Sequence, residues 1–96
     1  MQILTSIGTD EVKNRFEESA RAGGYSVREW LLPAANGKGL RVAATMKIKG
    51  RTHGLGFKWD GEDLNVLAAR CMALDLAMHT LPEAVAQGKN ALWEDQ

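Results

Sequence analysis

The segment from Leu40 to Ile48 constrains the fold more than any other part of the sequence. Its side chains alternate with a period of two: Leu40, Val42, Ala44, Met46 and Ile48 fall on one face, and Arg41, Ala43, Thr45, Lys47 and Lys49 fall on the other. Because successive side chains of a strand point to opposite sides, this pattern predicts a β-strand with one buried and one solvated face. We expect Val42, Met46 and Ile48 to be buried against helices.

Two more strands are predicted to flank this one. The segment from Arg51 to Trp59 follows a turn at Gly50 and can place Leu55, Phe57 and Trp59 on the inner face and Gly54, Gly56 and Lys58 on the outer. Glycines inside a strand indicate a bulge or a close approach of another chain segment. The segment from Tyr25 to Leu32 also has strand character, although its sidedness stays open, and Asn36 to Gly39 supply turn residues after it. The three segments predict an antiparallel meander.

One helix is predicted before this meander in the sequence and one after it. Thr9 can cap a first helix that ends at Gly23, after a segment from Met1 to Ile7 that is either a short strand or a frayed end. Asp60 can cap a second helix, whose first turn then holds Glu62 and Asp63.

The second helix is unusually apolar. Its expected core positions are Leu64, Leu67, Cys71, Leu74, Met78 and Leu81, and Val66, Ala69, Ala73 and Leu76 widen the apolar arc. A helix with so few polar positions is either mostly buried or has a second partner. Its methionines are expected to fill the core. A capping-box pattern from Thr80 to Glu83 predicts a short extra helix that runs to Gln87.

The element order predicts a single α+β domain over residues 1–96, with a core from about residue 9 to 81 and a C-terminal extension, a short helix or tail, over 82–96. The fold is helix, three-stranded antiparallel sheet, helix, with both helices on one face of the sheet. A length of 96 residues fits one domain with a thin core. The single cysteine, Cys71, cannot form an internal disulfide, and its place on the apolar arc predicts a buried, inert thiol.

This order of elements resembles the double-stranded RNA-binding domain between about Thr9 and Leu81. The central hairpin from Val42 to Gly56 is similar to that of the family, and so is the alanine-rich stretch from Ala68 to Leu74. The resemblance implies the fold. The RNA-binding residues are not carried over, because the family has a lysine cluster at the start of its second helix, where this chain has Asp60, Gly61, Glu62 and Asp63. Carboxylates at that place repel phosphate.

Basic residues are concentrated in the two later strands. The chain from Lys38 to Lys58 carries six Lys or Arg residues and no Asp or Glu, whereas the whole chain has a net charge of zero. This stretch is either a solvated strand face or a surface that faces an anionic partner. The candidate partner-binding residues are Arg28, Trp30, Arg41, Lys47, Lys49 and Lys58, where Arg28 and Trp30 belong to the set if Tyr25 and Val27 point inward.

No catalytic, cofactor-binding or metal-binding residues are predicted. His53, His79 and Cys71 are isolated in the sequence, and Asp75 and His79 are expected to form a surface contact one helical turn apart. The sequence has no apolar run long enough for a membrane span and no signal pattern at its N-terminus, so a cytoplasmic protein is expected.

We therefore expect a non-catalytic protein-interaction module, of an adaptor or inhibitor type, that docks through its basic sheet face or its second helix. Its partner is expected to be a protein with an acidic surface. The alternative is binding of RNA or single-stranded nucleic acid through the basic hairpin. The apolar second helix and Trp93 in the tail predict either a homodimer or a tail that folds back over apolar surface.

Overall fold

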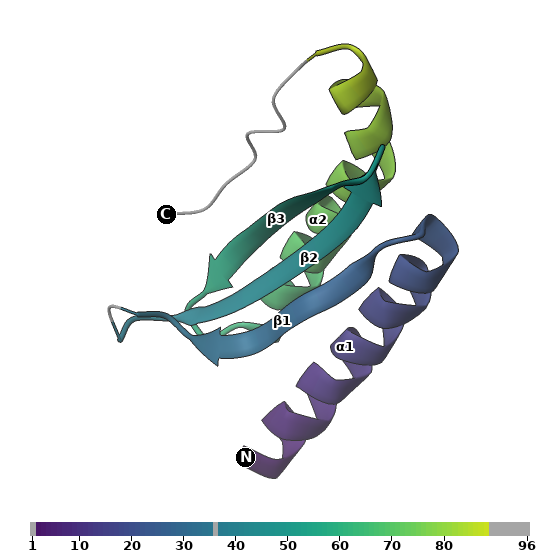
Figure 1. The fold of residues 1–96 in the computed structure, drawn as a ribbon. Helices are drawn as coiled ribbons and strands as arrows, with labels where there is room; N and C mark the ends of the chain where they lie inside the picture. Colours follow the sequence, from purple (N-terminus) through teal and green to yellow (C-terminus); the bar gives the residue numbers. More distant parts are fainter. Residues whose placement is uncertain (1, 36, 89–96) are drawn as a thin grey trace.

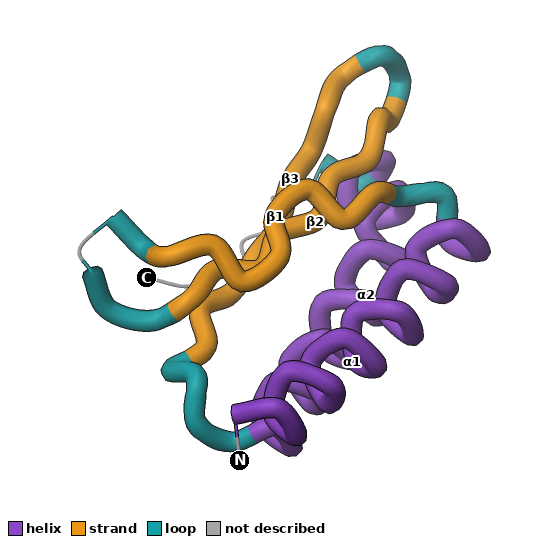
Figure 2. Tube along the Cα trace, turned by 90° about the horizontal axis from the view of Figure 1, so that it is seen from below, coloured by secondary structure: helices purple, strands orange, loops and turns teal. Residues whose placement is uncertain are grey.

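The computed structural model describes residues 2–35 and 37–88, with side chains from residue 8 onward. Its elements are α1 (Gln2–Gly23), β1 (Ser26–Pro33), β2 (Leu40–Ile48), β3 (Arg51–Trp59) and α2 (Leu64–Ala86) (Figure 1). The strands form one antiparallel sheet in the order β1-β2-β3. Figure 2 shows both helices on the same side of this sheet. The predicted α+β class and its order of helix, three strands and helix are confirmed.

The core lies between the sheet and the two helices. The inner face of the sheet contributes Val42, Ala44, Leu55, Phe57 and Trp59, all buried, and the predicted sidedness of β2 and β3 is confirmed. Met46 and Ile48 pack against this core but are only partly buried. They lie near the β2–β3 turn, which projects away from the helices in Figure 2. Of the three residues expected to be buried, only Val42 is fully buried.

The regular pairing of β2 and β3 depends on two glycines. Gly56 lies opposite Ala43 with no register shift, and a Cβ at Gly56 would come within 2.7 Å of the Val42 carbonyl oxygen. Gly54 lies opposite Thr45. The sequence predicted either a bulge or a close approach of another chain segment at these glycines. The close approach is correct and the bulge is wrong.

The first helix begins earlier than the sequence pattern predicts. α1 already runs from Gln2, so Thr9 lies inside the helix and the predicted strand or frayed end before it is wrong. Gly8 lies where α1 meets α2, and a Cβ there would collide with the side chain of Leu64. Close helix packing thus accounts for this glycine inside a helix.

The second helix has different ends from the predicted ones. Its N-cap is Asp63, whose Oδ1 accepts a hydrogen bond from the Asn65 N–H at 2.8 Å. Asp60 instead accepts from the Glu62 N–H at 2.9 Å and stabilises the turn before the helix. At the other end α2 continues through Pro82 to Ala86, so the predicted separate short helix is wrong.

The predicted capping box at Thr80 fails for a physical reason. The Thr80 hydroxyl donates to the carbonyl oxygens of Leu76 and Ala77, both at 3.1 Å, and thus bonds backward within the helix rather than forward as a cap. Leu81 beside it is buried, so its packing favours continuation of the helix. The tail residues Leu92 and Trp93 lie outside the described residues.

Candidate interaction surfaces

The outer face of the sheet carries its basic residues at two separate ends. Arg41 lies opposite Lys58 at one end, and Lys47 lies opposite Thr52 near the β2–β3 turn, where Lys49 is exposed. Small residues occupy the space between these ends, as Ala43 and Gly56 or Thr45 and Gly54 face one another across the strands. Arg41 is also partly neutralised, because its Nε lies 3.1 Å from Glu29 Oε1. The outer face is therefore not one continuous basic surface.

Trp30 does not belong to this face. It lies opposite Val42 on the inner side of the sheet, and its ring packs 6.3 Å from the ring of Phe16. The expectation that Trp30 projects outward is wrong. The cause is the irregular pairing of β1, where register shifts occur between Val27 and Glu29 and between Trp30 and Leu32. Each shift inserts one extra residue, so simple alternation along β1 no longer gives the side of the sheet.

The shifts also decide the position of Arg28. This residue falls within the first shift, has no partner on β2 and is exposed. Leu31 falls within the second shift and has a φ of 54°. Of the six candidate partner-binding residues, Arg41, Lys47 and Lys58 share the outer face, Lys49 lies at the turn, Arg28 lies at a bulge and Trp30 lies inside.

Among the described residues, three of the four large apolar side chains that are exposed lie on α2, and the fourth, Leu32, lies on β1. Met72 is 73% exposed, Leu76 is 66% exposed and Val66 is 39% exposed. Ala69 and Ala73 lie between them and are exposed as well. We call these five residues of α2 the α2 patch. Met72 was expected in the core, and only the excess of apolar positions on this helix pointed to a second contact surface.

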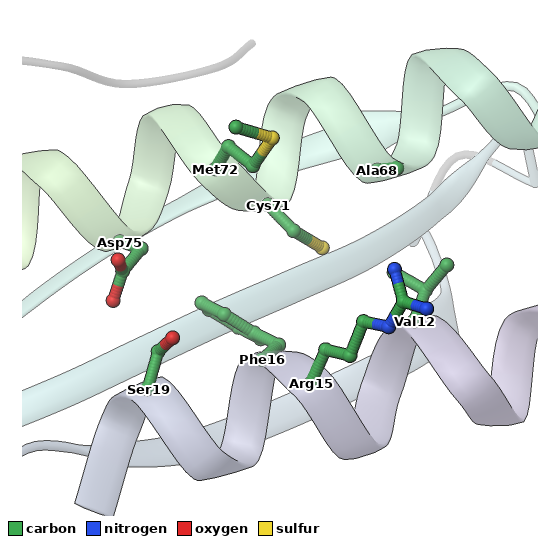
Figure 3. A pocket seen from close by; sticks show the side chains of 8 residues that line it. All are labelled: Val12, Arg15, Phe16, Ser19, Ala68, Cys71, Met72 and Asp75. Carbon is green, nitrogen blue, oxygen red and sulfur yellow. The ribbon is translucent and has the colours of Figure 1, made fainter. Parts of the chain in front are cut away.

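A hollow between the two helices adjoins the α2 patch. It has a volume of about 160 Å³ and is lined by Val12, Arg15, Phe16, Ser19, Ala68, Cys71, Met72 and Asp75. Figure 3 shows the side chains of Phe16 and Cys71 pointing into the space between the helices. Phe16 and Cys71 are buried, whereas Met72 is exposed and belongs both to the hollow and to the α2 patch. We call this space the interhelical hollow.

A hydrogen-bonded cluster lies at one end of the interhelical hollow. The hydroxyl of Tyr25 donates to Asp75 Oδ1, and His79 Nε2 lies 3.1 Å from the same oxygen. The expected contact between Asp75 and His79 is therefore confirmed, and Tyr25 is an addition that the sequence did not indicate. Burial, followed by the hydrogen bond to Asp75, raises the pKa of Tyr25 above its usual range. The cluster joins α2 to Tyr25 in the connection between α1 and β1.

Cys71 is a buried thiol, as expected. Burial raises its pKa from 9.0 to about 12, so the side chain stays protonated at neutral pH. A thiol of this kind is a poor nucleophile because the thiolate is the reactive form.

A second hollow lies where β3 leads toward α2. It is lined by Lys38, Gly39, Lys58, Trp59, Asp60, Val66 and Arg70. We call it the basic hollow, because three cations line it with a single carboxylate. Val66 belongs both to this hollow and to the α2 patch, so the two surfaces are continuous. The sequence did not indicate Arg70 as a site residue, since it lies outside the basic stretch from Lys38 to Lys58.

Within the described part of the chain, no three His, Cys, Asp or Glu side chains converge on a point where a metal ion could bind. No helix of this part is long and apolar enough to cross a membrane. No family model matches the chain, and neither a curated protein nor a solved structure is significantly similar to it. The likeness to the double-stranded RNA-binding domain thus rests on the order of elements and the segments named above.

Proposed function

We propose that this chain is a non-catalytic protein-interaction module that docks a protein partner on the α2 patch and the interhelical hollow. One observation carries the proposal: Met72 and Leu76 are 73% and 66% exposed on a helix whose opposite side forms the core. Burial of a Leu or Met side chain contributes about 1.5–3 kcal/mol. A partner that covers both residues therefore gains a substantial part of a binding free energy.

The interhelical hollow supports this assignment because it offers space for an anchor. Its volume of about 160 Å³ is close to the roughly 150 Å³ of an engineered cavity that accepts benzene. Apolar side chains such as those of Val12 and Phe16 line most of it. Met72 at its edge has an unbranched, adaptable side chain, and methionine is common at binding surfaces that fit their partners by repacking. A single aromatic or aliphatic anchor in such a pocket is typical of interface hot spots.

The polar groups near the hollow support a structural rather than a catalytic role. Asp75 accepts hydrogen bonds from Tyr25 and contacts His79, so its Oδ1 is engaged within the protein. The Cys71 thiol is protonated and buried. Ser19 lines the hollow, but within the described part of the chain its hydroxyl has no hydrogen bond to a base that would activate it as a nucleophile.

Nucleic-acid binding is the weaker candidate. It is favoured by the exposed Lys47, Lys49 and Arg51 around the β2–β3 turn. Single-stranded nucleic acid is usually held by aromatic side chains that stack on bases, and Trp30, the aromatic expected on this face, lies inside. We expect duplex RNA to bind no more tightly than about 10⁻⁴ M at physiological salt, within the range of non-specific attraction.

The test is selection of 16-residue peptides from a displayed library against the immobilised chain. We expect the double substitution Met72→Glu and Leu76→Glu to abolish binding of the selected peptides, because it places charge on the α2 patch. The matched control is Leu32→Glu, since Leu32 is 48% exposed on the other side of the molecule. Peptides that bind the double variant as well as the original chain would contradict the proposal. So would sub-micromolar binding of duplex or single-stranded RNA at physiological salt.

A further inference from the structure

We propose that the partner segment on the α2 patch is an amphipathic helix with carboxylates at the end that lies over the basic hollow. This inference rests on the proposed function and adds the chemistry of the partner. Its basis is the continuity of the two surfaces through Val66, which lines the basic hollow together with Lys58 and Arg70. A segment that covers the patch therefore reaches these two cations at one end.

Neither the Lys58 nor the Arg70 side chain forms an ion pair within the described part of the chain. Among the described residues neither side chain takes part in a hydrogen bond either, and Arg70 is exposed. The nearby carboxylates of Asp60 and Asp63 accept hydrogen bonds from the backbone N–H groups of Glu62 and Asn65 and stabilise the turn and the start of α2.

An external carboxylate can therefore pair with Lys58 and Arg70 without displacing a partner. The guanidinium of Arg70 can bind it through two parallel hydrogen bonds.

The spacing of the α2 patch fits a helical partner. Val66 and Leu76 are ten residues apart in α2, which corresponds to about 15 Å along the helix axis. A partner helix of about three turns covers this length and presents apolar side chains at intervals of three and four residues. Its acidic end then lies beside Arg70, one helical turn after Val66.

A second copy of the chain is a less suitable occupant. In a twofold, antiparallel pairing of two α2 helices, equivalent edges of the patch meet one another. α2 carries two acidic residues, Asp75 and Glu83, and Asp75 is already bonded to Tyr25 and His79. Glu83 follows Arg70 by thirteen residues and lies about 140° away around the helix. Arg70 and Glu83 thus lie on opposite edges of the patch, and the twofold cannot bring them together. In a parallel pairing opposite edges meet at the same height, and Glu83 lies about 20 Å further along the helix axis than Arg70, so the two residues do not meet either.

The experiment uses the peptides selected on the full chain. We expect the pool to be enriched in sequences with apolar residues at helical spacing and two or more Asp or Glu at one end. For the tightest such peptide, the double substitution Lys58→Glu and Arg70→Glu should weaken binding at least about tenfold. A peptide with its acidic residues changed to Lys should bind this variant better than it binds the original chain.

The matched control, Lys47→Glu with Lys49→Glu, makes the same charge change at the far end of the sheet and should leave affinity within about twofold.

The outcomes separate the two proposals. If Met72→Glu with Leu76→Glu abolishes binding but reversal of Lys58 and Arg70 does not change it, the docking function stands and the acidic partner is wrong. If neither double substitution matters, the docking function itself fails. Light scattering of the free chain decides the remaining alternative: a dimer that becomes a monomer on Met72→Glu and Leu76→Glu would show that a second copy occupies the patch, and would overturn the inference.

Discussion

The two sides of α2 are built from the same residue types and face different surroundings. On the inner side Leu74 and Met78 are 0% exposed, whereas on the outer side Leu76 and Met72 are 66% and 73% exposed. The inner residues contact the sheet and α1 as part of the core. The outer residues contact solvent, although a leucine and a methionine are costly to expose. The comparison shows that residue type alone does not locate the core of this helix, and that its outer side has a chemistry suited to a second contact.

The largest effect is expected from truncation of the inner leucine. Leu74→Ala should lower the free energy of unfolding by about 2–5 kcal/mol, because it removes buried methyl groups and leaves a cavity. Leu76→Ala is the matched control on the outer side and should change it by no more than about 0.5 kcal/mol. Urea unfolding followed by tryptophan fluorescence measures both values. Equal losses in the two variants would mean that the outer side of α2 is already covered in the folded chain.

The sequence predicts those parts of the fold where local periodicity and tertiary packing agree. The alternation from Leu40 to Ile48 gave the correct inner face because β2 lies between two strands and pairs regularly with β3. The same rule failed for Trp30, since the two register shifts in β1 are set by pairing with β2 and leave no signal in the β1 sequence itself.

The candidate surface was predictable only in part. An excess of apolar positions on the second helix indicated a further contact, but it did not show which of Met72 and Met78 is buried. A helix with apolar side chains on most of its circumference does not reveal which side faces the core. Arg70 was missed for a different reason. It is isolated among apolar residues in the sequence, and only the fold brings it beside Lys58 at the end of β3.

A smaller effect, confined to alkaline pH, is expected from the inner side of α2. Burial raises the pKa of Cys71 from 9.0 to about 12, so above pH 9 the unfolded chain loses a proton that the folded chain keeps. The contribution of this thiol to stability is thus complete below pH 9 and is lost as the pH rises toward 12. Tyr25, whose pKa is raised above 10.0, adds a second loss that begins above pH 10.

Urea unfolding at pH 8, 9.5 and 11 measures both contributions. Cys71→Ala should remove the decline between pH 8 and 9.5 while the decline above pH 10 remains. Tyr25→Phe should reduce the decline above pH 10 and should also lower stability at pH 8, because it removes the hydrogen bond to Asp75. An original chain whose stability is constant from pH 8 to 9.5 would contradict the burial of the Cys71 thiol in solution.

The smallest effect on stability is expected from oxidation of the outer methionine. Hydrogen peroxide reacts with accessible thioethers, so Met72 should become a sulfoxide well before Met78, which is 0% exposed. Fragmentation of the peptide that contains both residues locates the oxygen by mass spectrometry. Oxidised Met72 should change the free energy of unfolding by no more than about 0.5 kcal/mol, since its side chain is already in solvent.

The sulfoxide is polar, however, and at the edge of the interhelical hollow it should weaken binding of the selected peptides severalfold. Equal oxidation rates for the two methionines in the folded chain would remove the distinction between the sides of α2, and with it the physical basis of the docking surface.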